Sequence, residues 1–193
     1  RDCSPRWVLA SSGRLWELAK AGGDTSPFLD GFTPPLYLGA LEDDDARALI
    51  RQEALPADAR PEFTEEQIEH IRTTCGNHPY LIQLLCRRVI DEGDLDRAIE
   101  NVAADRAVSF FCAVDFDLLR EDERAVLRFL AEMSGASASS IVDRLPESAD
   151  TLPANLESLL RLGLVRELPA GEFNVANEFL RRWLLTEAAS LDR

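Results

Sequence analysis

The sequence lacks the patterns that mark membrane, secreted or metal-binding proteins. It contains no uninterrupted apolar run near the roughly 20 residues that span a bilayer, and no signal-peptide pattern. Its four cysteines are scattered and lack the close pairs of zinc or redox motifs. From these absences we expect no membrane segment, no metal site within this chain, and reduced thiols in a cytoplasmic protein.

Basic residues are scarce, and Lys20 is the only lysine. The formal net charge is −14 at pH 7. Residues 42–115 hold 17 acidic and eight basic residues, and residues 116–193 hold 14 acidic and nine basic residues. Because affinity for nucleic acid depends largely on neutralising phosphates, this balance argues against a DNA-coating surface, and we do not expect DNA as a partner.

The first 41 residues have the pattern of an α/β protein. The apolar run Arg6-Trp7-Val8-Leu9-Ala10 ends in the turn signal Ser11-Ser12-Gly13, which predicts a buried strand entering a loop. A short amphipathic helix follows, and Leu36-Tyr37-Leu38 predicts a second strand. Two strands alone do not make a stable sheet, so we expect residues 1–41 to be the end of a larger parallel α/β core.

Residues 42–109 are predicted to form a unit of four helices. Acidic residues around Asp43 begin the first helix, and Thr64 with Gln67 forms a capping box for the second. The third helix, over residues 79–92, ends at Gly93, and Asp94 caps the fourth. In the third helix, the apolar residues at helical spacing are expected to bury a broad face: Tyr80, Leu81, Leu84, Leu85, Val89 and Ile90.

Residues 110–193 are predicted to form a separate domain. Residues 110–117 show no clear helical period, and we interpret them as a connector. Helices are expected over residues 121–133, 137–145 and 152–162, followed by a hairpin of residues 164–168 and 172–175 and a last helix over 177–188. Three helices followed by a hairpin are typical of a winged helix-turn-helix domain.

The corner between the second and third helices of residues 42–109 is the most informative stretch of the chain. Gly76 can end one helix in a left-handed conformation, and Pro79 suits the first turn of the next. Free backbone N–H groups at a helix N-terminus favour anions, and His78 lies among them. The alternative from local chemistry alone is that His78 and Pro79 serve only to begin the helix.

Three motifs make the chain resemble the C-terminal half of AAA+-like and STAND-type signal-transduction ATPases. Val8-Leu9-Ala10-Ser11-Ser12-Gly13 is similar to the sensor 1 strand, and Leu36-Tyr37-Leu38-Gly39-Ala40-Leu41 to the last core strand. Gly76-Asn77-His78-Pro79-Tyr80-Leu81 is similar to the Gly-x-Pro motif of the lid. The resemblance implies a mainly α chain with a remnant of a parallel α/β P-loop core (1–41), a four-helix lid (42–109) and a winged-helix domain (110–193).

The resemblance also implies a nucleotide switch. By this resemblance, Gly76, His78 and Pro79 would contact ATP or ADP, and Ser11 or Ser12 would sense the γ-phosphate region. The parent protein would also bind Mg²⁺. The implied partner is the upstream P-loop core of the same polypeptide, with self-association on activation. In this family the winged helix commonly packs back on the nucleotide site.

Two catalytic motifs of that family are missing. The sequence contains no G-x-x-x-x-G-K-[ST] phosphate loop, and no apolar strand that ends in magnesium-binding acidic residues. The acidic run Glu42-Asp43-Asp44-Asp45 is interpreted as a solvated first helical turn. We therefore expect this chain not to hydrolyse ATP by itself.

Two other functions remain open from the sequence. The third helix of a winged helix normally reads DNA, and here it offers Asn155, Glu157, Ser158 and Arg161. With one basic and one acidic side chain, this helix is poorly suited to recognise DNA. Arg181 and Arg182 beside Trp183 do form a small basic and aromatic cluster. The last alternative is a protein-interaction scaffold without nucleotide.

Overall fold

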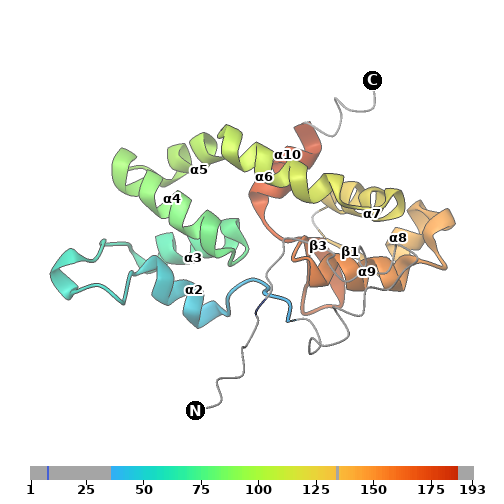
Figure 1. Ribbon diagram of the computed structural model, residues 1–193, viewed down its shortest axis with the longest axis horizontal. Helices are drawn as coiled ribbons and strands as arrows, with labels where there is room; N and C mark the ends of the chain where they lie inside the picture. The colour runs from blue at the N-terminus through green and yellow to red at the C-terminus, as the bar shows by residue number, and fades with distance from the viewer. Residues whose placement is uncertain (1–7, 9–35, 134, 187–193) are drawn as a thin grey trace, which may run out of the picture. The chain divides into compact units, whose positions relative to one another are not determined.

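The protein is mainly α-helical in the part that the structure describes (Figure 1). The structure is a computed structural model, and it describes residues 8, 36–133 and 135–186. The chain divides into residues 1–37 and a compact unit of residues 38–193, and the helices and strands named below belong to the second unit. Ser11, Ser12 and all of the predicted first strand except the exposed Val8 lie outside the described residues.

The predicted second strand at Leu36-Tyr37-Leu38 is wrong. Residues 36–42 have no regular secondary structure, and Leu36 and Leu38 are both exposed. A strand exists only where a neighbouring strand satisfies its backbone groups, and no strand among the described residues pairs with this segment.

The helices expected between residues 42 and 105 are confirmed, and their ends follow local signals. Their bounds, with a short 3₁₀ turn, are α2 (Asp43–Ile50), η2 (Ala57–Ala59), α3 (Glu65–Cys75), α4 (Pro79–Glu92) and α5 (Leu95–Ala103). Thr64 and Gln67 form the capping box of α3, and the Asp94 carboxylate accepts from the Arg97 N–H at the start of α5. Gly76 and Gly93 end α3 and α4 in the left-handed region.

The buried face of α4 differs from the predicted one. Leu81, Leu85 and Val89 are buried as expected, but Tyr80 is 43% exposed and Ile90 59% exposed. Ile82 and Cys86 occupy the buried side instead. The run of apolar residues is wide enough to fit more than one face, and packing against α2, α3 and α5 selects among them.

The predicted connector at residues 110–117 is helical, as part of α6 (Arg106–Asp117). Val108, Cys112 and Phe116, spaced four residues apart, form its buried side. Phe110 is 71% exposed, so apolar residues lie on both sides of the helix and obscure its period in the sequence.

The elements after α6 follow the expected order with one added strand. They are α7 (Glu121–Glu132), β1 (Ala136–Ser137), α8 (Ala138–Arg144), η3 (Pro146–Ser148), α9 (Leu152–Arg161), β2 (Val165–Glu167), β3 (Glu172–Val175) and α10 (Glu178–Thr186). The hairpin of β2 and β3 is confirmed, with Val165 opposite Val175. The short strand β1 pairs with the other edge of β3, so the antiparallel sheet has the order β1-β3-β2.

Helix α10 joins the two ends of residues 38–193 into one core. It packs against α7 and β3, and also against α3, α5 and α6 (Figure 1). Trp183 of α10 is buried and meets Phe116 of α6 edge to face, with ring centroids 5.4 Å apart. Among the described residues, no helix is both long enough and apolar enough to cross a membrane.

Candidate functional site

The candidate site is the corner between α3 and α4, and hydrogen bonds define its backbone. Gly76 has φ 57° and ψ 38°. Its N–H donates to the Thr73 carbonyl at 3.3 Å, and the Asn77 N–H donates to the Arg72 carbonyl at 3.2 Å. This pair of bonds is the Schellman ending of a helix, which satisfies two of the last carbonyls of α3.

Gly76 also lies against the junction between β3 and α10. A Cβ atom at this position would be 1.9 Å from the Ala176 carbonyl oxygen, which is backbone and cannot turn aside. Ala176 is next to Asn177, whose side-chain oxygen accepts from the Leu180 N–H at 2.9 Å to cap α10. Both the positive φ and this close approach require glycine at position 76. The α3–α4 corner therefore packs directly against the C-terminal elements.

Asn77 ties the corner to the chain entering α2. It also has a positive φ, 58°, which asparagine tolerates better than most residues. Its amide nitrogen donates to the Leu41 carbonyl at 2.9 Å and to Asp43 at 2.8 Å. The Leu41 N–H donates in return to the Asn77 carbonyl at 3.0 Å. These bonds fix where residues 38–41 approach the corner.

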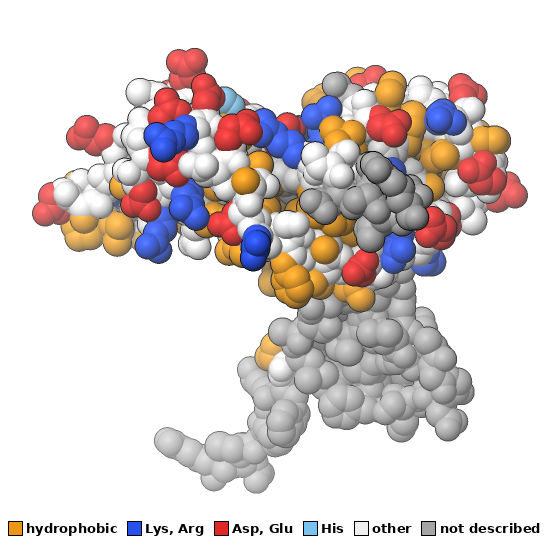
Figure 2. All heavy atoms as spheres, turned by 90° about the horizontal axis from the view of Figure 1, so that it is seen from above, with side chains coloured by type: hydrophobic (Ala, Val, Ile, Leu, Met, Phe, Trp, Pro, Cys, Tyr) orange, Lys and Arg blue, Asp and Glu red, His pale blue; other side chains and the backbone are white. Residues whose placement is uncertain are grey.

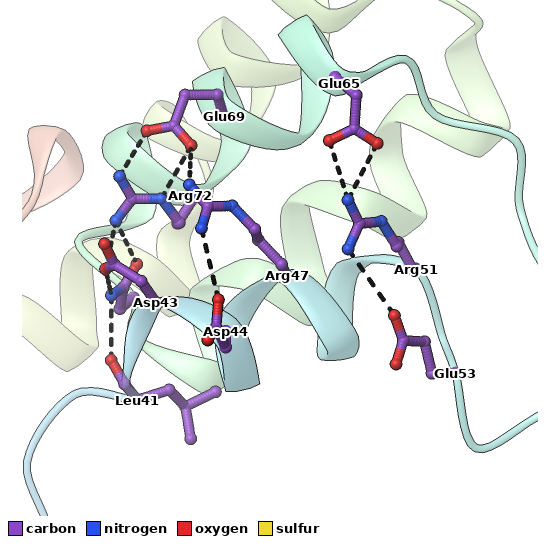
Figure 3. Close-up of polar contacts among 10 residues, drawn as sticks. Leu41, Asp43, Asp44, Arg47, Arg51, Glu53, Glu65, Glu69 and Arg72 are labelled. Carbon is purple, nitrogen blue, oxygen red and sulfur yellow. Dashed lines mark hydrogen bonds and ion pairs between the residues drawn. The ribbon is translucent and has the colours of Figure 1, made fainter.

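A network of charged residues supports the same junction (Figure 3). Arg72 contacts Asp43 at 2.5 Å and also binds Glu69. The Arg47 guanidinium donates to Glu69 from α2 at 2.9 Å. Hydrogen bonds from Arg72, and then from Arg47, lower the pKa of Glu69 to about 2. Because the Glu69 side chain is 44% exposed, solvent screens much of the stabilisation that this shift represents.

His78 precedes α4 and makes no capping hydrogen bond with its side chain. Its Nδ1 atom is buried and has no hydrogen-bond partner among the described residues. The ring lies edge-on to Phe111 of α6 at 5.3 Å and to Tyr80 at 6.5 Å. Burial lowers the pKa of His78, so the imidazole is neutral at neutral pH.

Pro79 and the residues after it supply the other groups of the corner. Pro79 is at the start of α4, as predicted, and the first intrahelical bond runs from the Ile82 N–H to the His78 carbonyl. The N–H groups of Tyr80 and Leu81 precede that bond, and such groups favour negatively charged ligands. The exposed Tyr80 ring is 6.0 Å from Phe111. The corner therefore combines two donors with an aromatic surface.

The structure brings three of the five predicted site residues together, namely Gly76, His78 and Pro79. Sequence reasoning missed the role of Asn77, although a Gly-Asn pair after a helix was a usable signal for two left-handed residues. It also missed Phe111, because that residue lay in the segment interpreted as a connector. Among the described residues, no cluster of three His, Cys, Asp or Glu side chains could hold a metal ion.

Helix α9, the expected DNA-reading helix, has few side chains available for that task. Asn155 is completely buried, and its amide donates to the Thr151 hydroxyl at 3.1 Å while its oxygen accepts from Arg120. Asn155 is therefore not available to contact DNA bases. Arg161 pairs with Glu157 at 2.8 Å on the same helix. Figure 2 shows Arg and acidic side chains interspersed over the visible face rather than a continuous basic surface.

Comparisons with known proteins give a weak similarity to a solved structure. No protein-family model matches the sequence, and no curated protein matches it. Among solved structures, the chain is similar to the Walker-type ATPase PABY2304 of Pyrococcus abyssi, with a TM-score of 0.48 and 18% sequence identity. The similarity covers 74% of this chain and 40% of that chain, so it spans well under two thirds of the length of that protein.

Proposed function

We propose that residues 42–193 are the nucleotide-sensing lid and winged-helix regulatory region of a larger P-loop NTPase of the AAA+/STAND type. In this proposal they act as a conformational switch that responds to ADP and ATP. The observation that carries it is the α3–α4 corner, where His78 keeps a buried, unpartnered Nδ1 while Gly76 is fitted against Ala176. A ligand at this corner would thus be next to the contact between the two ends of the unit.

The assignment of a winged helix is supported by element order. A helix, a short strand, two helices and a hairpin follow one another, and β1 joins the hairpin to make a three-stranded sheet. The buried Asn155 and the Glu157–Arg161 pair favour a regulatory role over DNA reading. We assign residues 42–109 to the lid and 110–193 to the winged helix, with α6 continuous across the boundary.

The residues of the corner fit part of a nucleotide. Pro79 and Tyr80 would pack against a base or ribose, and the N–H groups of Tyr80 and Leu81 would donate to phosphate oxygens. The sequence contains neither a glycine-rich phosphate loop nor acidic magnesium ligands at a strand end, so this chain does not hydrolyse ATP alone. Those groups would come from the upstream P-loop core, together with Ser11 or Ser12, and self-association would follow activation.

The switch needs a difference in affinity between its two states. A nucleotide that bound both arrangements equally would not shift their populations, and a useful shift requires a few kcal/mol of differential binding. Gly76 provides a direct route for that difference, because any movement of the corner changes its contact with Ala176.

The test is the nucleotide content of the full-length protein that carries this chain, released with acid and quantified by chromatography. We expect nearly one ADP or ATP per protein, and loss of most of it in His78→Ala. The matched control is His70→Ala, which changes the other, exposed histidine and should retain nucleotide. An empty wild-type protein with normal circular dichroism, or equal retention in both variants, contradicts the proposal.

A further inference from the structure

A groove between α9 and the β2–β3 hairpin is a distinct feature that the nucleotide proposal leaves unexplained. Its volume is about 360 Å³, which is within the size range of ligand sites in proteins. A cavity of about 450 Å³ between α3, α5 and α10 is larger, but Arg182 on its wall is already paired with Glu100 and Glu178. The principal lining residues of the groove are Leu152, Leu156, Leu160, Phe173, Glu157 and Glu167.

The groove has an apolar floor and carboxylates from two different elements. Leu152, Leu156 and Leu160 follow one another at four-residue spacing along α9 and form one stripe, of which Leu152 and Leu156 are buried and Leu160 is partly exposed. Phe173 of β3 is also partly exposed and lines the groove as well. Glu157 of α9 and Glu167 of β2 are both exposed. An apolar surface with acidic groups beside it is complementary to an apolar side chain with a nearby cation.

The charges of this surface argue against a nucleic acid as the occupant. Both exposed carboxylates would repel phosphates, and Arg161 is engaged by Glu157. That pair is a surface i,i+4 ion pair worth about 0.3–0.5 kcal/mol, so a cation from a partner can replace Arg161 at small cost.

We propose that this groove binds a short amphipathic segment of a partner protein, in which an aliphatic or aromatic anchor lies three or four residues from an arginine or lysine. The anchor packs on the partly exposed Leu160 and Phe173, and the cation pairs with Glu157 or Glu167. This mode is that of a helix laid in a groove, where apolar anchors give affinity and charges set orientation. The proposal does not depend on nucleotide binding at the α3–α4 corner.

The test uses random peptides of about 12 residues displayed on phage, selected on the full chain and counter-selected on a Glu157→Arg/Glu167→Arg variant. Both substitutions are at exposed positions, and circular dichroism checks that the variant folds. We expect selected peptides to share an apolar residue spaced three or four positions from Arg or Lys. A fluorescent copy should bind the wild type and lose about tenfold or more in affinity on the double variant.

The matched control is Asp143→Arg/Glu147→Arg, which makes the same change of charge at exposed positions that do not line the groove. Its affinity for the peptide should be within about twofold of that of the wild type. If the attraction were unspecific and only electrostatic, both variants would lose affinity equally. Failure to enrich peptides, selection of peptides without basic residues, or equal losses on the two variants overturns the proposal. Salt-dependent binding of duplex DNA to the wild type would overturn it too, in favour of nucleic acid.

Discussion

At the scale of single residues, two neighbouring side chains of the corner have different tasks. Asn77 is held by its partners, with its amide on Leu41 and Asp43. His78 is held mainly by packing, with Nδ1 unpartnered among the described residues. Substitutions of Asn77 therefore report on the stability of the corner. Substitutions of His78 report on its protonation and, under the proposed function, on nucleotide binding.

Replacing Asn77 should separate the value of its side chain from that of its backbone conformation. Asn77→Ala loses the hydrogen bonds and places alanine at φ 58°, so we expect it to lower the free energy of unfolding by about 2–3 kcal/mol. Asn77→Gly loses the same bonds but accepts the positive φ, and should cost less than the alanine variant. Urea denaturation measures both. Equal losses in the two variants would contradict a left-handed residue at this position.

The lowered pKa of His78 predicts a loss of stability on the acid side. The unfolded chain binds a proton near the ordinary histidine pKa of 6.5, whereas burial opposes protonation in the folded state. The free energy of unfolding therefore falls as the pH drops through 6.5, and this loss stops once the pH is below the folded pKa.

His78→Gln should remove that loss. Melting temperatures measured between about pH 7.5 and about pH 5.5 should fall less in His78→Gln than in the wild type. His70→Gln is the control and should follow the wild type. A wild type and a His78→Gln variant with parallel pH profiles would show that the folded state does not oppose protonation of His78.

At the scale of elements, local sequence signals predicted most helix ends. The capping box at Thr64 and Gln67 and the glycines at 76 and 93 each act within a few residues, so they are visible in the sequence. Helix α6 was missed because its apolar residues lie on both its buried and exposed sides. Which side of α6 is buried depends on packing against other elements, and the spacing of apolar residues in the sequence does not determine it.

In the candidate site too, features set by local sequence were predictable and features set by distant contacts were not. The turn at Gly76 and Pro79 was predictable, because each residue has a strong conformational preference of its own. The contacts of Asn77 with Leu41 and Asp43 were not predictable, because these partners are far from Asn77 in the sequence, by 36 and 34 positions respectively. The burial of Asn155 was likewise not predictable, because its polarity indicated exposure and its partner Arg120 is 35 positions away in the sequence.

Two helix-ending glycines provide an internal comparison. Gly93 has φ 71° and open space where a Cβ atom would lie, so Gly93→Ala should cost only the backbone strain of about 1–2 kcal/mol. Gly76→Ala has the same strain and also meets the Ala176 carbonyl, which should add about 1–3 kcal/mol. Urea denaturation of both variants gives the difference, and equal costs would contradict the contact between the corner and the β3–α10 junction.

At the scale of the whole unit, apolar packing outweighs the ion pairs between its two ends. Arg182 of α10 donates to Glu100 of α5 at 2.7 Å, but Glu100 is 70% exposed and such pairs contribute about 0–1 kcal/mol. Trp183 is buried against Phe116, and truncating a buried aromatic residue typically costs about 3–5 kcal/mol. The continuous core, whose residues run from Leu41 to Leu184, predicts that these elements unfold together.

Trp183 allows this cooperativity to be measured. In a Trp7→Phe/Trp16→Phe background it is the only tryptophan, so its fluorescence reports on α10 while far-ultraviolet circular dichroism reports on all helices. We expect the two urea midpoints to coincide. Adding Gly76→Ala should lower both midpoints by the same amount, although Gly76 and Trp183 lie in different elements, because the Gly76–Ala176 contact joins the corner to α10. If the substitution lowers the circular dichroism midpoint and leaves the Trp183 midpoint unchanged, the corner and α10 unfold independently, and a nucleotide at the corner has no route to the C-terminal elements through this contact.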